Sequence, residues 1–278
     1  MTAVPSVTLN NGVEIPQLGF GVFQVPPEST VETLSAAFEI GYRHIDTAQG
    51  YRNEREVGQA VAESGIDRSE FFVTSKLASS ALDYDQALEG IDVTLAALNL
   101  DVLDLFLIHW PLPTVRDYVE PWKAFEKILA DGRVRAVGVS NFQVAHLQRI
   151  FDECDIVPAV NQIEAHPYLT QAELVAFDEA HGIATEAWSP IARGAVLNDE
   201  ALVRIGELHE KSAAQVTLRW HIQRGSIIFP KSMSPARMRE NFEIFDFELS
   251  DVEIHQIDGL DRGQRFGPDP DTFEGPRG

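Results

Sequence analysis

The chain has 278 residues, of which 44 % are hydrophobic and 23 % are charged, and these proportions are typical of a folded globular protein. Its 43 acidic residues outnumber the 22 lysines and arginines, so the formal net charge is -21. This charge argues against broad binding of nucleic acid or of anionic membranes, and an anionic ligand must meet a local group of cations. The N-terminal stretch lacks the features of a signal peptide, so a cytoplasmic protein is expected.

The first predicted element is a β-hairpin. Val7 and Leu9 on one side, and Val13 and Ile15 on the other, alternate with polar residues around an Asn-Gly pair. This pattern is typical of two antiparallel strands joined by a two-residue primed turn.

Eight short apolar runs follow the hairpin, and each is predicted to be a strand. The segments between them, such as 29–40, 84–100 and 171–182, place apolar residues three and four apart and predict helices. This alternation, without a linker or a break in composition, favours a single (β/α)8 TIM barrel domain over residues 1–278; the main rival is a doubly wound open sheet. The predicted strands are Leu18–Val22, His44–Asp46, Phe72–Lys76, Leu103–His109, Val134–Ser140, Ala159–Ile163, Ala184–Trp188 and Ile227–Phe229.

Motifs of several other classes of enzyme are incomplete in this chain. Residues 19–21, Gly-Phe-Gly, begin like a dinucleotide fingerprint, but Phe23 and a glutamine follow where its third glycine should fall. His209 opens a stretch that lacks the second histidine of a zinc protease, and Cys154 has no local Cys or His partner, so no metal is predicted. Phe142 replaces the second glycine of a hydrolase nucleophile elbow.

Polar, ionisable or aromatic residues stand at the ends of seven of the eight predicted strands. In such a barrel the carboxyl ends of the strands meet at one rim, where the chemistry gathers. Each residue alone is explained by a cap, a turn or a side chain reaching water, but their joint occurrence predicts a site. They are Asp46, Lys76, His109, Ser140 with Asn141, Gln162, Trp188 and Lys231.

A phenol joins this set, because Tyr51 follows Asp46 by five residues. A phenol has an ordinary pKa of about 10 and is a weak acid at neutral pH. We expect the ammonium of Lys76 to lower the pKa of Tyr51, and Asp46 to keep that lysine charged and oriented. His109 is placed to donate a second hydrogen bond to the oxygen on which charge develops when a carbonyl is reduced.

The sequence closely resembles the aldo-keto reductase family. The resemblance spans nearly the whole chain in the family's order, and it is greatest to the small prokaryotic members, which include diketo-gluconate reductases. It implies a barrel that binds extended NADPH without a Rossmann domain and transfers a hydride to an aldehyde or ketone, with NADH as a weaker cofactor. The matching stretches are GYRHIDTAQGYRNE, TSKL, LDLFLIHWP, VGVSNF, NQIEAHPY, WSP and FPKSMSPARMRENFEIFDFEL.

Carried over by position, the resemblance implies three groups of site residues. The catalytic four, with Tyr51 as general acid, are Asp46, Tyr51, Lys76 and His109. The residues implied to hold the nicotinamide end and the adenosine 2'-phosphate end of the cofactor are Ser140, Asn141, Gln162, Trp188, Ser189, Lys231, Ser232, Arg237, Glu240 and Asn241. The substrate pocket is implied to be lined by Phe23, Gln49, Tyr51, Ala78, His109 and Trp110.

The phosphate end has a physical rationale as well. Ser234 and Pro235 look like the N-cap and first position of a helix, with Arg237 in its first turn, where a cation opposes the helix dipole. A bound phosphate explains this arrangement. Several members of the family carry a basic residue in place of Ser234, which weakens the expected preference for NADPH. Ala78 stands where the family often has Trp, which predicts a wider substrate pocket, and the segment after Gly259 predicts a loose tail near its mouth.

Two other functions stay open at this point. A nucleotide-binding sensor or structural protein would keep the cofactor cleft without turnover. A Schiff-base aldolase would need a lysine with a lowered pKa, whereas Asp46 is expected to raise the pKa of Lys76. The reductase is the favoured interpretation, with a small carbonyl compound as substrate and a monomer as the expected assembly.

Overall fold

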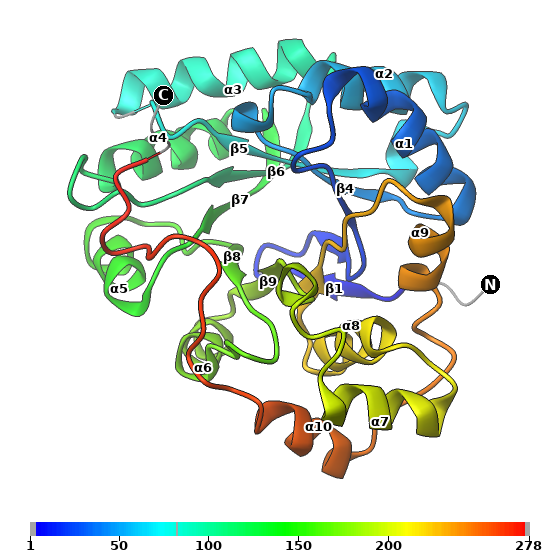
Figure 1. Cartoon of the computed structure of the whole chain (residues 1–278). Coiled ribbons are helices and arrows are strands. Elements are labelled where there is room, and N and C mark those ends of the chain that lie inside the picture. The colour runs from blue at the N-terminus through cyan, green and yellow to red at the C-terminus, as the bar shows by residue number, and fades with distance from the viewer. Residues whose placement is uncertain (1–3, 82, 276–278) are drawn as a thin grey trace.

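A computed structural model describes residues 4–81 and 83–275 of the chain (Figure 1). Eight parallel strands form one sheet in the order β10-β9-β8-β7-β6-β5-β4-β3. Leu18 bridges to Ile228, and the N–H of Gly19 donates to the Ile228 carbonyl at 2.8 Å, which brings the two edges together. The predicted (β/α)8 TIM barrel is thereby confirmed. The strands are β3 Phe20–Gly21, β4 His44–Asp46, β5 Phe72–Leu77, β6 Leu103–Ile108, β7 Val134–Ser140, β8 Val160–Glu164, β9 Ala184–Trp188 and β10 Ile227–Ile228.

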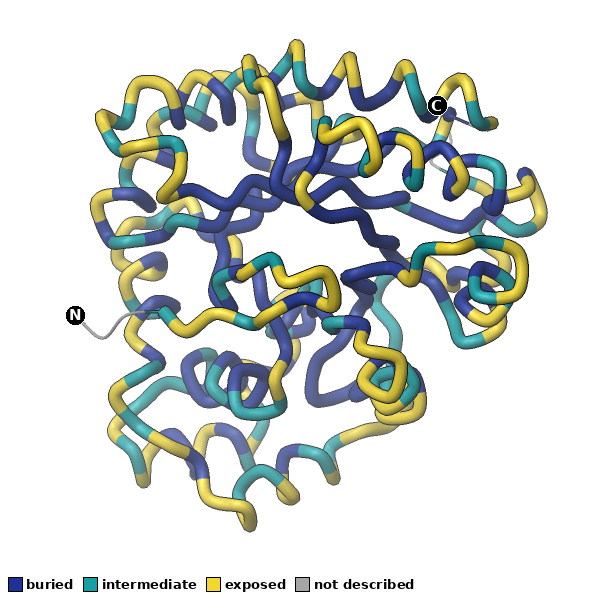
Figure 2. Tube along the Cα trace, turned by 180° about the vertical axis from the view of Figure 1, so that it is seen from behind, coloured by how far each residue is buried: buried dark blue, intermediate teal, exposed yellow. Residues whose placement is uncertain are grey.

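Helices surround the strands, and Figure 2 shows the buried strands at the centre with exposed residues on the outside. The predicted helices at 29–40, 84–100 and 171–182 correspond to α1, α3 and α6, whose ends differ from the predictions by at most two residues. Within the described ranges, no helix is both long and apolar enough to cross a membrane. The helices are α1 Pro27–Ile40, α2 Glu54–Glu63, α3 Tyr84–Leu98, α4 Val119–Ala130, α5 Val144–Glu153, α6 Ala172–Ala180, α7 Glu200–His209, α8 Ala213–Gln223, α9 Pro235–Phe242 and α10 Asp251–Asp258.

The predicted hairpin is present, formed by β1 (Ser6–Thr8) and β2 (Glu14–Pro16). Its predicted two-residue primed turn is wrong. The N–H of Leu9 donates to the Val13 carbonyl at 2.9 Å, so three residues form the loop, and only its last residue, Gly12, has a positive φ (85°). The side chains of both asparagines in the loop donate hydrogen bonds to backbone carbonyls of the barrel. These contacts join segments distant in the sequence, so the residues of the turn alone do not predict them.

The hairpin fills the amino-terminal end of the barrel. Leu9 and Ile15 are buried in one cluster with residues that face the barrel interior, such as Leu105, Leu107 and Phe229. Because these side chains fill the amino-terminal end, a site can form only at the opposite end, between the loops that follow the carboxyl ends of the strands.

Side chains along each strand alternate between the barrel interior and the helix layer. In β6, Phe106 and Ile108 pack in the cluster that includes the helices, whereas Leu107 packs in the interior cluster. His109, which follows β6, continues the inward-facing series at the carboxyl end.

Candidate active site

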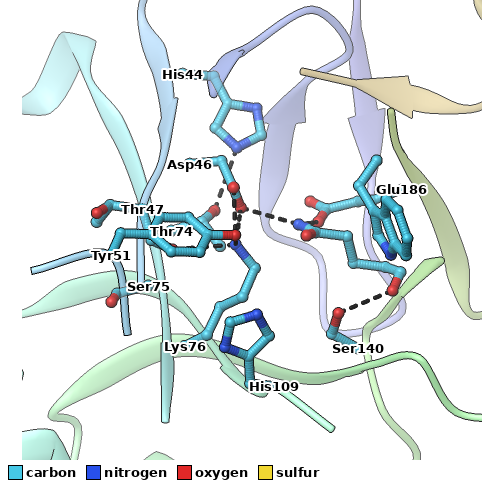
Figure 3. A network of polar contacts seen from close by, with 12 residues as sticks. His44, Asp46, Thr47, Tyr51, Thr74, Ser75, Lys76, His109, Ser140 and Glu186 are labelled. Carbon is cyan, nitrogen blue, oxygen red and sulfur yellow. Dashed lines mark hydrogen bonds and ion pairs between the residues drawn. The ribbon is translucent and has the colours of Figure 1, made fainter. Parts of the chain in front are cut away.

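The predicted catalytic four lie together at the carboxyl end of the barrel, where Figure 3 shows their side chains around a common point. Asp46 is the last residue of β4, and Lys76 is the penultimate residue of β5. Tyr51 ends a 3-10 turn over residues 49–51, and His109 directly follows β6. Four separate segments of the chain thus contribute one residue each.

Lys76 and Asp46 form a buried ion pair. Nζ of Lys76 lies 2.7 and 2.6 Å from the two carboxylate oxygens of Asp46, and it also donates to the Thr47 carbonyl at 3.0 Å. Burial favours the neutral amine, but the charge of Asp46 and the hydrogen bonds that its carboxylate accepts act in the opposite direction, and the pKa of Lys76 is raised. This direction agrees with the expectation, and it does not suit a Schiff-base lysine.

The hydroxyl of Tyr51 lies 3.4 Å from Nζ of Lys76. Burial raises the pKa of Tyr51, and the ammonium of Lys76 lowers it by less. The expected net lowering of this pKa is therefore wrong, because the sequence does not show how deeply the phenol is buried. Tyr51 keeps its proton at neutral pH, as a proton donor must, and the nearby ammonium stabilises the phenolate once the proton has left.

His109 stands across from Tyr51, with the two ring centroids 5.8 Å apart and the rings at 76°. Burial lowers the pKa of His109 to about 3, and the charges of Lys76 and Arg116 act in the same direction. The imidazole is therefore neutral and carries one N–H donor. Its ring nitrogens make no hydrogen bond within the described residues, so that donor is available to a substrate oxygen.

We expect His109 to stay neutral between about pH 5 and pH 8, since its pKa lies well below the ordinary 6.5 of histidine. Nitrogen chemical shifts of histidine-labelled protein, with the His109 signals assigned by their loss in His109→Gln, measure this directly. A His109 ring that takes up a proton near pH 6.5 would contradict the expectation.

The residues predicted to hold the nicotinamide end lie beside the catalytic four. Ser140 donates from its hydroxyl to the Gln162 carbonyl at 2.9 Å. Nδ2 of Asn141 donates to the His109 carbonyl at 2.9 Å, and Nε1 of Trp188 donates to Oδ1 of Asn141 at 2.8 Å. Ser189, the next residue, opens the following loop with φ of 51°.

Glu186 belongs to the same network, although it was not among the predicted site residues. Nε2 of Gln162 donates both to Oδ2 of Asp46 at 2.9 Å and to Oε2 of Glu186 at 2.7 Å. Glu186 is completely buried, and Figure 3 places it across from the ion pair. Its position two residues before Trp188 was the available signal, because residues i and i+2 of a strand face the same side.

The tail of the chain packs against the back of this network. Glu164, the last residue of β8, accepts the backbone N–H groups of Phe266 at 2.6 Å and Gly267 at 2.9 Å. A Cβ at Gly267 would lie 2.3 Å from Cη2 of Trp188, so only glycine allows this close approach. The prediction of a loose tail is therefore wrong for this segment, because its contacts are with residues distant in the sequence.

Aromatic side chains border the predicted substrate pocket. Phe23 is 51 % exposed, and its ring centroid lies 5.0 Å from that of Tyr51. Trp110 is mostly buried, and its ring centroid lies 4.5 Å from that of Phe273 in the tail. Phe23 thus lies beside the phenol of Tyr51, and Trp110 lies beside His109, with their ring centroids 6.5 Å apart.

The side chain of Gln49 holds the rim of this pocket together. Its NH2 donates to the Gly90 carbonyl at 2.7 Å and to the Thr94 hydroxyl at 3.0 Å. Its carbonyl oxygen accepts the backbone N–H of Ala78 at 2.6 Å. Both ends of the amide thus bind other segments of the protein, and contact of Gln49 or Ala78 with substrate stays a prediction.

The predicted phosphate end lies at the start of α9. Ser234 is the N-cap and Pro235 the first helical residue, as predicted, but the Ser234 side chain caps no backbone N–H. The Ser234 N–H instead donates to the hydroxyl of Ser232 at 3.1 Å. The other predicted residues here are the exposed Lys231 and Arg237, the half-buried Glu240 and the buried Asn241.

No group of three or more His, Cys, Asp or Glu side chains that could hold a metal ion is found over residues 4–81 and 83–275. Cys154 is half-buried, and burial raises the pKa of its thiol to about 11. A thiol with so high a pKa is a poor nucleophile at neutral pH.

The fold and the site define a barrel oxidoreductase that acts on carbonyl groups. The model of the Aldo/keto reductase family matches residues 17–262, and the chain belongs to this family. An aldo-keto reductase of Mycolicibacterium smegmatis is 50 % identical over 269 residues, which cover 97 % of this chain and 98 % of that protein. The glyoxal reductase of Bacillus subtilis is 47 % identical over 269 residues, with coverage of 96 % and 97 %. A crystal structure of a Gox0644 mutant in complex with NADPH has 42 % identity and a TM-score of 0.94, with coverage of 98 % and 99 %.

Proposed function

We propose that this protein reduces aldehydes and ketones to alcohols with NADPH, and that Tyr51 is the general acid. The observation that carries the proposal is the phenol of Tyr51, which is protonated and lies 3.4 Å from the buried ammonium of Lys76. The neutral ring of His109 stands beside it with its donor available. The NADPH complex of Gox0644 and the name of the Bacillus subtilis relative support the cofactor and the reaction.

In this mechanism the side chains handle the proton and the charge. NADPH, when bound, supplies the hydride. Tyr51 transfers its hydroxyl proton to the carbonyl oxygen of the substrate, while His109 donates a hydrogen bond to the same oxygen. Lys76 stabilises the phenolate left on Tyr51, and Asp46 compensates the charge of the lysine throughout.

The residues present suit the nicotinamide end of NADPH. The side-chain carbonyl oxygen of Gln162 makes no hydrogen bond within the part of the chain that the structure describes, so it is left to accept one from a carboxamide. Ser140 and Asn141 would complete the polar contacts, and the indole of Trp188 would provide the stacking surface.

The start of α9 suits the phosphate end. Its first backbone N–H groups are not capped by the Ser234 side chain, and Lys231 and Arg237 are exposed beside them. Free N–H groups at a helix start, together with cations, bind phosphate. NADH lacks the 2'-phosphate, so we propose that it serves as a weaker cofactor.

Small α-dicarbonyl compounds are our first choice of substrate class. The support is the 47 % identity to a glyoxal reductase over nearly the whole chain. Other aldehydes and keto-sugar acids follow, because Ala78 leaves the pocket without the wall that a larger side chain would form there.

Absorbance at 340 nm tests this proposal, with NADPH and separately NADH, against aldehydes, α-dicarbonyls and keto-sugar acids. We expect carbonyl-dependent oxidation that is faster with NADPH and fastest with an α-dicarbonyl. If no carbonyl in the panel oxidises either cofactor although NADPH binds, the result favours the silent sensor over the reductase. The expectations of a single domain, a monomer and a cytoplasmic location stay predictions.

A further inference from the structure

Glu186 is a buried carboxyl group for which the mechanism above has no use. None of its surface is exposed, and it lies in β9 directly beside Gln162 of β8 in the register of the sheet. Oε2 accepts a hydrogen bond from Nε2 of Gln162 at 2.7 Å, and Oε1 has no partner among the described residues. A buried polar group of this kind is costly unless it does something that an apolar residue cannot do.

The two carboxyl groups around Gln162 determine which way its amide points. Both oxygens of Asp46 accept hydrogen bonds from the ammonium of Lys76 in an ion pair, so Asp46 acts toward Gln162 as an acceptor. The atom of Gln162 that lies 2.9 Å from Asp46 and 2.7 Å from Glu186 must therefore be the NH2 nitrogen. Both of its hydrogens are then directed to carboxyl groups, which leaves the carbonyl oxygen as the outward end.

We propose that Glu186 is a positioning residue: together with Asp46 it fixes the amide of Gln162 so that the carbonyl oxygen faces the carboxamide of the nicotinamide cofactor. The inference rests on the proposed function, in which Gln162 contacts that carboxamide. With only one acceptor the amide would keep one hydrogen bond and could rotate about it. A second acceptor, on a neighbouring strand, removes that freedom.

The protonation state of Glu186 does not change this role. Burial raises the pKa of Glu186 to about 8, and the charge of Asp46 adds to the rise, while Lys76 opposes it. Of the strands that pair with β9, β8 faces Glu186 with the neutral Gln162 and β10 with Ile227. The carboxyl group is therefore mostly protonated at neutral pH, and its second oxygen still accepts from the amide.

The test compares two replacements of the same residue. Glu186→Gln keeps an oxygen that can accept from Gln162, whereas Glu186→Leu has similar volume and no acceptor. We expect Glu186→Leu to raise the dissociation constant of NADPH about tenfold, which is the effect of one lost hydrogen bond of about 1.4 kcal/mol, and Glu186→Gln to stay within about twofold of wild type. Titration of NADPH fluorescence measures both, without any turnover.

A second readout reports orientation itself. NADPH that carries deuterium on one face of its nicotinamide ring shows from which face the hydride is taken. We expect the wild-type protein and Glu186→Gln to transfer from one face, and Glu186→Leu to transfer a mixture of hydrogen and deuterium. The reason is that a nicotinamide ring whose carboxamide is held on one side alone can bind with either face toward the substrate. A loss of packing alone would change stability but not this ratio.

Asp178 provides a matched control. It is also completely buried, burial raises its pKa to about 8, and it accepts from the amide of Asn161, the neighbour of Gln162 on β8. Asn161 faces the helix layer, since neighbouring residues of a strand point to opposite sides. Asp178→Leu is expected to cost stability as Glu186→Leu does, but to leave NADPH binding at the wild-type value.

A double variant keeps the test decisive if Glu186→Leu does not fold. Gln162→Met with Glu186→Leu replaces both partners by apolar groups and leaves neither unsatisfied. If Glu186 acts through Gln162, the double variant binds NADPH as weakly as Gln162→Met alone.

Three results would overturn the inference. The first is a folded Glu186→Leu variant that binds NADPH as the wild type does and transfers hydride from one face. The second is an equal loss of NADPH affinity in Glu186→Gln and Glu186→Leu. The third is a double variant that binds NADPH distinctly more weakly than Gln162→Met alone. Failure of the reductase proposal would look different: no carbonyl would oxidise NADPH in any variant, while the binding titrations would still compare Glu186 with Asp178.

Discussion

Tyr51→Phe is expected to lower kcat/KM for carbonyl reduction by about 10²- to 10⁴-fold, which is the range of a lost general acid, and to leave NADPH binding nearly unchanged. The variant removes only the hydroxyl that lies 3.4 Å from Lys76, and the ring keeps its contact with Phe23. Steady-state oxidation of NADPH and a fluorescence titration of NADPH measure the two quantities.

Tyr118→Phe is the matched control, because Tyr118 is also largely buried but packs against Phe142 and His146 in the helix layer. It is expected to keep wild-type turnover. Normal turnover in Tyr51→Phe would remove Tyr51 from its assigned role. If Tyr51→Phe and Tyr118→Phe lost activity equally, the loss would reflect damage to the fold.

Lys76→Met is expected to affect stability and activity together. The ammonium of Lys76 is the cation that compensates the buried carboxylate of Asp46, and breaking such a buried pair costs about 3–5 kcal/mol. Turnover should fall as well, because no ammonium would remain to stabilise the phenolate of Tyr51. Denaturant unfolding and NADPH oxidation, measured on the same preparation, test both expectations.

The double variant Asp46→Asn with Lys76→Met separates the two effects. Removal of both charges leaves no uncompensated ion, so much of the lost stability should return. Activity should stay low, since the phenolate still lacks its cation. A double variant as unstable as Lys76→Met would show that the ion pair is not the source of the loss, and one with restored turnover would contradict the role of the lysine.

The sequence was sufficient to predict the barrel and the meeting of Asp46, Tyr51, Lys76 and His109 at one end of it, because both depend on local patterns; their catalytic roles stay a prediction. Each strand carries its own apolar run, and Asp46, Lys76 and His109 stand where such runs end. The net direction of the Tyr51 pKa was not predictable in the same way. It depends on how much water the surrounding segments exclude from the phenol, and that is a property of the assembled site.

Glu186 and the hairpin turn were missed for a related reason. In the sequence Glu186 is one polar residue within a short strand, and its importance comes from Gln162 and Asp46, which are supplied by β8 and β4. The turn after Leu9 carries the Asn-Gly pair typical of a primed turn, but its asparagine side chains bind barrel carbonyls more than 100 residues away in the sequence. Contacts between distant segments decided both cases.

The two shortest strands of the sheet, β3 and β10, meet where the barrel closes. We call this junction between the two edges of the sheet the seam. Within residues 4–81 and 83–275, one bridge, from Leu18 to Ile228, joins the two edges there, in contrast to the longer ladder between β5 and β6. Amide hydrogens along the seam are therefore expected to exchange with solvent through smaller openings than those of β6. Trp188 precedes β10 in the chain, and Lys231 and α9 follow it. A cofactor that contacts both Trp188 and α9 would therefore restrain the chain before and after β10, and it should slow amide exchange along the seam.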